Sequence, residues 1–173
     1  TKFGGTLETW FGLPRARLAY WDGAKMSVAA TGLRYANGIN GSPDGAMIYV
    51  AEALGFQVRF YARDAASGAL TEKDHLYLGT GLDNIDIDDA GNLWIAAHPH
   101  LLDFVAHAGD AKKLSPSQVL RVTAPSAEQG EARQVYLDLG EEISGSSVAA
   151  VHKGRMLVGS VFEPKYLNCA APK

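Results

Sequence analysis

Three segments of the chain share one build, in which a polar cluster is followed by alternating residues, a glycine turn and an apolar run. They are YANGINGSPDGAMIYVAEAL at 35–54, LDNIDIDDAGNLWIAAHPHL at 82–101 and SGSSVAAVHKGRMLVGSVFE at 144–163. In each segment the glycine turn joins two short runs of β-branched or aromatic residues, which is typical of a β-hairpin. A repeated hairpin predicts a repeated β-sheet unit.

The repeat continues beyond its hairpin. After the first hairpin, residues 57–78 contain another strand, a turn and a strand, which gives four strands per unit. Residues 115–124 and 133–139 return to strand chemistry in the second unit. Four-stranded units with a period of about 40–50 residues are typical of β-propeller blades. We therefore predict an all-β fold, with one partial β-propeller domain over residues 1–173.

The spacing of the copies predicts an insertion. Gly45 aligns with Gly91 46 residues later, whereas Gly91 aligns with Gly154 only after 63 residues, so we expect extra length in the third copy. Residues 101–114 have apolar side chains at helical spacing, and we assign a short helix there to the insertion. A propeller closes with roughly four to eight blades, and this chain supplies about three. We expect an upstream half or a second copy of the chain to close the ring.

Composition excludes some partners. Sixteen Lys and Arg against nineteen Asp and Glu give a net charge of −3 without a basic block, so we do not expect nucleic acid to bind. The longest apolar stretch, 93–108, is interrupted by three histidines and Asp103, so no transmembrane segment is expected. Thr1 is not a start methionine and no leader-like segment follows it, so we expect any targeting segment to have lain upstream.

Polar residues recur where each inner strand begins. The inner strands of a propeller run along its central channel, so equivalent positions in successive blades converge there. These positions hold Asn37-Gly38, Asp83-Asn84 and Ser146-Ser147. One carboxylate and two amide carbonyls suit a hard cation such as calcium, which takes about six to eight oxygen ligands. Asn37, Asp83 and Asn84 are therefore candidate calcium ligands, with the alternative that they only cap turns before strands.

The histidines differ in their surroundings. His98 follows the second inner strand and Pro99 fixes its exit, so it is a candidate for supporting the site or transferring a proton. The alternative is an ordinary structural histidine. His75, His107 and His152 are expected at the solvated surface.

Five segments of the sequence resemble the paraoxonase and arylesterase family: YANGINGSPDG, LDNIDID, LWIAAHPH, SQVLRV and GSSVAAVHKGRMLVGSVFEP. They occur in the family's order, and the likeness extends from Trp10 to Cys169. The resemblance implies a six-bladed propeller of the gluconolactonase-like superfamily, of which this chain is the C-terminal half. It also implies hydrolysis of lactones and aryl esters with calcium as cofactor.

The resemblance also implies roles for single residues. Asn37, Asp83 and Asn84 match the family's catalytic calcium ligands, and Asp83 and His98 match catalytic positions. The family's other ligands and its water-activating histidine pair would lie upstream. Substrate-pocket positions are matched by Tyr35, Ala53, Val105, Ser147 and Val161. Ala53 and Val105 are smaller than the family's usual leucine and phenylalanine, which leaves substrate preference open.

Cys169 is the one cysteine, and by itself it indicates a free thiol near the C-terminus. The resemblance instead implies the distal half of a disulfide with an upstream partner, and hence a secreted or periplasmic protein.

Two other functions stay open. One is a sugar-lactone hydrolase of the gluconolactonase kind. Comparing the rates of hydrolysis of a sugar lactone and an aryl ester would distinguish it from a paraoxonase-like hydrolase. The other is a non-catalytic or strictosidine-synthase-like propeller that acts as a binding module, which would show no calcium-dependent turnover.

Overall fold

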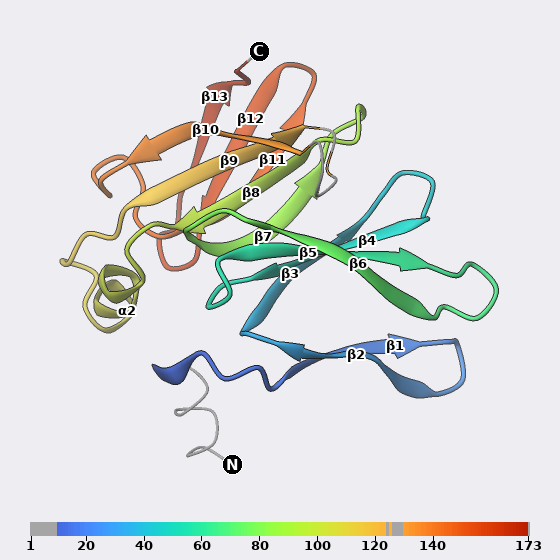
Figure 1. The fold of residues 1–173 in the computed structure, drawn as a ribbon. Helices are drawn as coiled ribbons and strands as arrows, with labels where there is room; N and C mark the ends of the chain where they lie inside the picture. The colour runs from blue at the N-terminus through green and yellow to red at the C-terminus, as the bar shows by residue number, and fades with distance from the viewer. Residues whose placement is uncertain (1–9, 124, 126–129, 173) are drawn as a thin grey trace.

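A computed structural model describes residues 10–123, 125 and 130–172 of the chain. Thr1 and Lys173, the two ends of the predicted 1–173 domain, lie outside these residues. The described chain folds into four antiparallel sheets that follow one another in an open arc, from β1 and β2 to β11, β12 and β13 (Figure 1). The predicted all-β fold is confirmed.

The two central sheets are complete four-stranded blades in which the chain runs from the inner strand to the outer one. The first contains β3 (Ala36–Gly41), β4 (Met47–Glu52), β5 (Gln57–Arg63) and β6 (Leu70–Tyr77). The second contains β7 (Gly81–Ile87), β8 (Leu93–His98), β9 (Ser117–Thr123) and β10 (Glu131–Asp138). Both sheets have the sequential strand order that hairpin connections produce.

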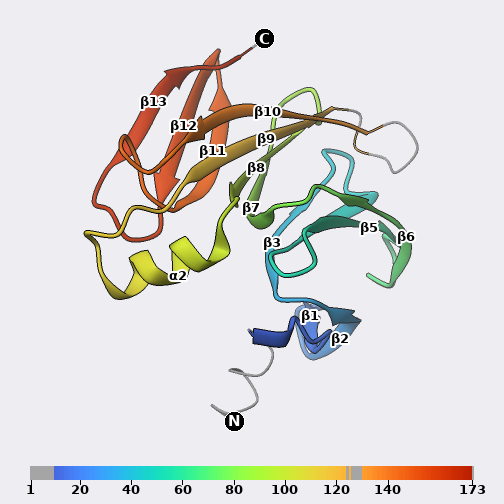
Figure 2. The same cartoon turned by 60° about the vertical axis from the view of Figure 1, so that its left-hand side comes forward.

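The sheets at the two ends have fewer strands. The first contains β1 (Ala16–Trp21) and β2 (Met26–Leu33), and the last contains β11 (Ser146–His152), β12 (Arg155–Ser160) and β13 (Tyr166–Ala170). In Figure 2 these two sheets lie at opposite ends of the arc. Each therefore packs on its neighbour with one face and has a second face that no sheet of the described chain covers.

The sheets pack face to face, and the β7–β10 sheet is covered on both faces. Leu93, Ile95 and Ala97 of β8 face the preceding blade, where they share a core cluster with β4 and β5. Trp94, from the same strand, packs instead with Met156 and other residues of the last sheet. All six residues of β8 are buried as a result, so the strand is apolar from Leu93 to Ala97 rather than alternating, and only His98 at its end is polar.

The glycine turns confirm the predicted hairpins. Gly45, Gly91 and Gly154 have φ angles of 71°, 81° and 74°, in the left-handed region that glycine adopts without strain. They join β3 to β4, β7 to β8 and β11 to β12. The repeat therefore encodes the two innermost strands of three successive sheets.

The predicted helical insertion near residues 101–114 is present, but its assignment to the third copy is wrong. The additional length lies between β8 and β9, inside the second blade rather than in the third copy. It contains α2 (Leu101–Gly109), whereas residues 110–114 are not helical. The offset of 63 residues spans both places, so the alignment of glycines could not tell them apart. In the described part of the chain, no helix has the length and apolar character needed to cross a membrane.

Asp88 organises the turn between β7 and β8. Its carboxylate accepts hydrogen bonds from Asn92 N at 2.9 Å, Ala90 N at 3.0 Å and the Trp94 indole at 2.9 Å. Burial alone would raise the pKa of Asp88, but the hydrogen bonds from Asn92 and Trp94 lower it below its usual value. The turn is thus fixed to the core tryptophan by an ionised carboxylate.

We expect Asp88→Asn to lower the free energy of unfolding by about 2 kcal/mol at neutral pH, because its amide would face donors. The lowered pKa means that the stabilisation by Asp88 is complete above the unfolded value of about 3.9 and is lost as pH falls through the folded value. The difference between variant and wild type should therefore shrink below about pH 4. Urea unfolding followed by tryptophan fluorescence, at neutral pH and below about pH 4, measures this difference in the free energy of unfolding.

The matched control is Asp89→Asn, which makes the same charge change at the adjacent, exposed position. Equal losses of stability in the two variants would contradict the role given to Asp88.

Candidate active site

Each inner strand starts with a pairing irregularity at its polar residues. In β3 the register shifts between Ala36 and Ile39, in β7 between Leu82 and Ile85, and in β11 between Ser146 and Val148. Such bulges bend a strand and redirect its side chains. The polar pairs Asn37-Gly38 and Asp83-Asn84 are the residues left out of the pairing in β3 and β7. In β11 only Ser147 is left out, because Ser146 pairs with Ser160.

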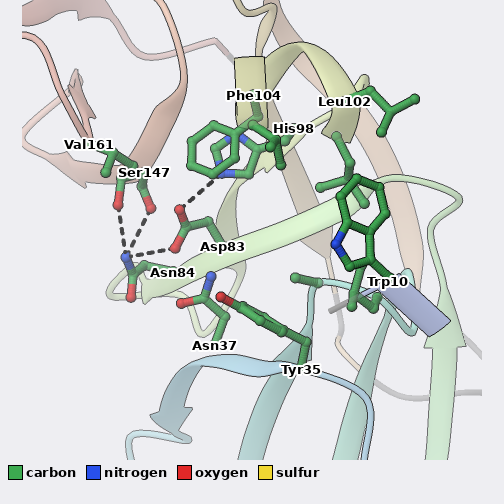
Figure 3. A pocket seen from close by; sticks show the side chains of 14 residues that line it. Trp10, Tyr35, Asn37, Asp83, Asn84, His98, Leu102, Phe104, Ser147 and Val161 are labelled. Atoms are coloured by element: carbon green, nitrogen blue, oxygen red, sulfur yellow. Dashed lines mark hydrogen bonds and ion pairs between the residues drawn. The ribbon is translucent and has the colours of Figure 1, made fainter. Parts of the chain in front are cut away.

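The bulges of β3 and β7 are in direct contact. A Cβ atom at Gly38 would lie 2.5 Å from the Asp83 carbonyl oxygen and 2.7 Å from the Asn84 Cα. Only glycine permits this approach of two backbones. The close contact sets Asn37 beside Asp83 and Asn84, and Figure 3 shows the three side chains converging.

Asn84 joins the second blade to the last sheet. Its amide nitrogen donates to Asp83 Oδ1 at 3.1 Å, to the Ser147 carbonyl at 3.0 Å and to Ser147 Oγ at 3.1 Å (Figure 3). Because the NH₂ group is committed to these acceptors, the Asn84 Oδ1 atom is the end of the amide left to accept a ligand.

Buried serines hold the segment that carries Ser147. Ser117 Oγ donates to the Ile143 carbonyl at 2.6 Å and accepts from Ser146 N at 3.0 Å. Ser146 Oγ accepts in turn from Gln118 N at 3.2 Å. These bonds fix the start of β11 to β9. Ser147, the partner of Asn84, is therefore placed by hydrogen bonds between serine hydroxyls and backbone groups.

Asp83 and His98 form a buried pair. The Asp83 carboxylate Oδ2 lies 3.1 Å from His98 Nε2, and the side chains are 7% and 3% exposed. With Asp83 ionised, Nε2 is the protonated nitrogen, because a carboxylate can only accept. His98 Nδ1 is buried and has no hydrogen-bond partner among the described residues. The pair thus gives Asp83 a fixed orientation.

Helix α2 covers the histidine. The Phe104 ring stacks on the His98 ring with centroids 3.8 Å apart and an interplanar angle of 29°. Phe104 also packs against Phe162, with centroids 5.6 Å apart. Gly145 makes room for it, because a Cβ there would lie 3.2 Å from the phenylalanine ring. His98 is therefore fixed by a hydrogen bond at its edge and by an aromatic ring on its face.

One cavity, of about 730 Å³, brings the candidate residues together. Its lining includes all the residues for which the sequence predicted a site: Tyr35, Asn37, Ala53, Asp83, Asn84, His98, Val105, Ser147 and Val161. Five further lining residues were not predicted: Trp10, Leu54, Leu101, Leu102 and Phe104. Three of these five lie on α2, whose helical spacing was visible in the sequence without indicating which face meets the cavity.

The cavity has a polar floor and apolar walls. Asn37, Asp83 and Asn84 lie together at one end, and the apolar side chains of Trp10 and Leu102 lie toward the other end (Figure 3). This division is typical of a site for a small, mainly apolar molecule that carries one polar group.

The comparisons with known proteins identify the family of the chain. The arylesterase family model matches residues 1–170. The chain is 36% identical over 163 residues to human serum paraoxonase/arylesterase 1, and 35% identical over 157 residues to chicken serum paraoxonase/arylesterase 2. These matches cover 94% and 90% of this chain but only 45% and 44% of those proteins. The chain belongs to the arylesterase family.

The solved structures that resemble this chain show its fold. A luciferin-regenerating enzyme matches with a TM-score of 0.55 at 18% identity, over 79% of this chain and 40% of that one. A calcium-binding protein, regucalcin, from Agrobacterium tumefaciens matches with a TM-score of 0.55 at 16% identity, over 88% and 48%. Both are propeller proteins, and this chain is a partial β-propeller that spans less than half the length of the curated relatives it matches.

The oxygen donors of the cavity are of the kind that a hard cation prefers. Asp83 offers a carboxylate, Asn84 offers its Oδ1 atom, and Asn37 makes no side-chain hydrogen bond among the described residues that would occupy its amide oxygen. All three are oxygen donors, which calcium prefers over nitrogen or sulfur. In the described part of the chain, no three His, Cys, Asp or Glu residues cluster as a metal site of their own.

One histidine expectation is wrong. His107 is buried, with 3% of its surface exposed, and its Nδ1 donates to the Lys113 carbonyl at 2.7 Å. It lies on the face of α2 that packs on Phe162, where a polar ring is tolerated because one nitrogen has a backbone partner. His75 and His152 are exposed, as expected.

The contact between bulges makes Gly38 a test of the site. We expect Gly38→Ala to lower the free energy of unfolding by about 1–3 kcal/mol, because the methyl group must push the β3 and β7 backbones apart. Gly109→Ala is the matched control, since a Cβ at Gly109 would meet nothing within 4 Å. Thermal unfolding of the two variants measures the difference. A Gly38→Ala protein as stable as Gly109→Ala would contradict the close approach.

Proposed function

We propose that this chain supplies part of the active site of a calcium-dependent hydrolase of lactones and aryl esters. The observation that carries the proposal is the cavity in which one carboxylate, two side-chain amides and a carboxylate-bound histidine meet apolar walls. Membership of the arylesterase family supports ester hydrolysis as the reaction class.

Asn37, Asp83 and Asn84 would hold the calcium ion through their side-chain oxygens. Bound calcium supplies a Lewis acid that polarises the ester carbonyl and stabilises the oxyanion formed when water attacks. Further ligands would come from outside this chain, from substrate or from water, because three donors are fewer than calcium requires.

The walls would bind and orient the substrate. Tyr35, Leu102, Val105 and Val161 would contact the apolar part of an ester or lactone, leaving its carbonyl toward the polar floor. Ala53 and Val105 are small, so the cavity has room for a bulky leaving group or ring at those points. Binding on the walls would orient the carbonyl for attack.

Asp83 and His98 would carry out the proton transfer from the attacking water. Asp83, held by His98 Nε2 and by the Asn84 amide, can accept a proton from attacking water as a general base. His98 Nδ1 is the free acceptor of the pair and can orient water or relay a proton. Phe104 keeps the histidine ring in the plane that this requires.

The partners and location follow from the same proposal. We expect a small-molecule ester or lactone as substrate, and an upstream half or a second copy to complete the propeller. The family's relatives include proteins named serum paraoxonase, which favours a secreted or periplasmic protein. Cys169 packs beside β12 in the described structure, and any disulfide would need a cysteine from outside these 173 residues.

Replacing Asp83 tests the proposal. In the protein produced in full, with any sequence that precedes or follows these residues, we expect Asp83→Asn to weaken calcium binding at least about a hundredfold and to remove phenyl acetate hydrolysis. Calorimetric calcium titration and an esterase assay with and without chelator measure the two effects.

Asp86→Asn, which changes the same charge on β7 away from the cavity, is the control and should keep both properties. Full activity in Asp83→Asn would overturn the assignment. Faster turnover of a sugar lactone than of phenyl acetate by the wild type would favour a gluconolactonase-like substrate range instead.

A further inference from the structure

Glu52, the last residue of β4, is fully buried, although it carries a carboxylate. Its Oε1 atom accepts a hydrogen bond from Arg34 N at 2.6 Å. Its Oε2 atom accepts from Arg59 Nε at 3.1 Å and from the Gln57 side chain. Both oxygens are thus occupied by three donors from two segments, Arg34 before β3 and the two β5 residues, and a buried carboxylate requires such partners.

The turn after β4 closes directly over this carboxylate. A Cβ atom at Gly55 would lie 2.6 Å from Glu52 Oε2, so only glycine allows the chain to pass there. Phe56, next in the turn, has a φ of 55°, a conformation that a non-glycine side chain adopts only under constraint. The shape of the turn therefore depends on the glutamate beneath it.

The same carboxylate connects the turn to the cavity wall. Glu52 holds Arg34 N, and the turn returns two backbone bonds to that segment: Ala53 N to the Tyr35 carbonyl at 3.0 Å and Leu54 N to the Arg34 carbonyl at 3.3 Å. Tyr35 also has a φ of 55°. Tyr35, Ala53 and Leu54 all line the cavity, and Asn37 follows two residues later.

Arg59 completes the arrangement without reaching the cavity. It donates to Glu72 Oε1 at 3.0 Å and to the Gly32 carbonyl at 3.1 Å, while holding Glu52. A buried ion pair adds little stability over apolar packing of the same volume. The Glu52–Arg59 pair instead connects β5, the turn after β4 and the segment that leads to Tyr35 through hydrogen bonds.

We propose that Glu52 is a positioning residue of the candidate active site. It holds Tyr35 and the Ala53-Leu54 turn as one rigid wall, and this wall selects substrates by the bulk of the group that lies against it. The selection of substrates rests on the proposed ester hydrolysis, whereas the rigidity of the wall does not.

The test uses Glu52→Gln in the protein produced in full. Glutamine keeps the size of the side chain but turns an NH₂ group toward donors. By hydrogen exchange, we expect the amides of residues 34, 53 and 54 to exchange at least about tenfold faster than in the wild type, with β8 and β9 unchanged. The preference between two esters, measured as the ratio of kcat/KM for phenyl acetate to kcat/KM for 2-naphthyl acetate, should move toward one. We expect this ratio to change by about threefold or more, mainly through changes in KM.

Glu72→Gln is the matched control. It removes the same charge from the neighbourhood of the same arginine, but Glu72 is half-exposed and does not contact the Arg34 segment. Exchange and the substrate ratio should stay at wild-type values in this variant. If Glu52→Gln does not fold, Gln57→Met removes only a neutral donor and should speed exchange of the same amides by a smaller factor.

The outcomes separate the two proposals. Unchanged exchange in Glu52→Gln would overturn the positioning role, whatever the activity. Faster exchange with an unchanged substrate ratio would make Glu52 a purely structural residue and also overturn it. If the wild type hydrolyses neither ester, the proposed function fails, and exchange alone then decides whether Glu52 holds the wall.

Discussion

The close contact between the bulges of neighbouring inner strands is the constraint on which the site depends. Face-to-face packing brings β3 and β7 together until the Gly38 backbone touches that of Asp83 and Asn84. At this separation, polar side chains from the two blades line one cavity. A side chain at Gly38 would separate the blades and the donors together, so the fold and the site share one requirement.

The bulges explain why the polar residues of the repeat differ while their positions do not. A bulge needs a local irregularity of pairing, which many residues tolerate, so each copy is free to carry its own polar side chain. The second blade supplies the carboxylate, the first supplies Asn37, and the last supplies Ser147 as the acceptor that orients Asn84. A repeated backbone thus builds an asymmetric site.

The sequence predicted the sheets because turn glycines and strand chemistry act locally, and it predicted the convergence of Asn37, Asp83 and Asn84 because a repeat places equivalent positions together. It could not place the insertion, since a change in spacing between two glycines does not say where the residues were added. The burial of His107 and the roles of Phe104 and Glu52 depend on contacts between distant segments. Glu52 follows an apolar strand like any terminal polar residue, and only the turn folded over it makes it different.

The site divides its chemistry between two kinds of element. The polar floor lies on the inner strands, whose positions are fixed by packing on both sides, so the donors are held with little freedom. Much of the apolar wall lies on α2, an insertion between β8 and β9 that no other blade of the described chain has. A change in α2 can alter the shape of the cavity without moving the bulges. Phe104 is the exception, because its stacking on His98 connects the variable wall to the fixed floor. Under the proposed ester hydrolysis, changes at that one helix position should therefore affect both selectivity and catalysis, whereas changes at Leu102 or Val105 should affect selectivity alone.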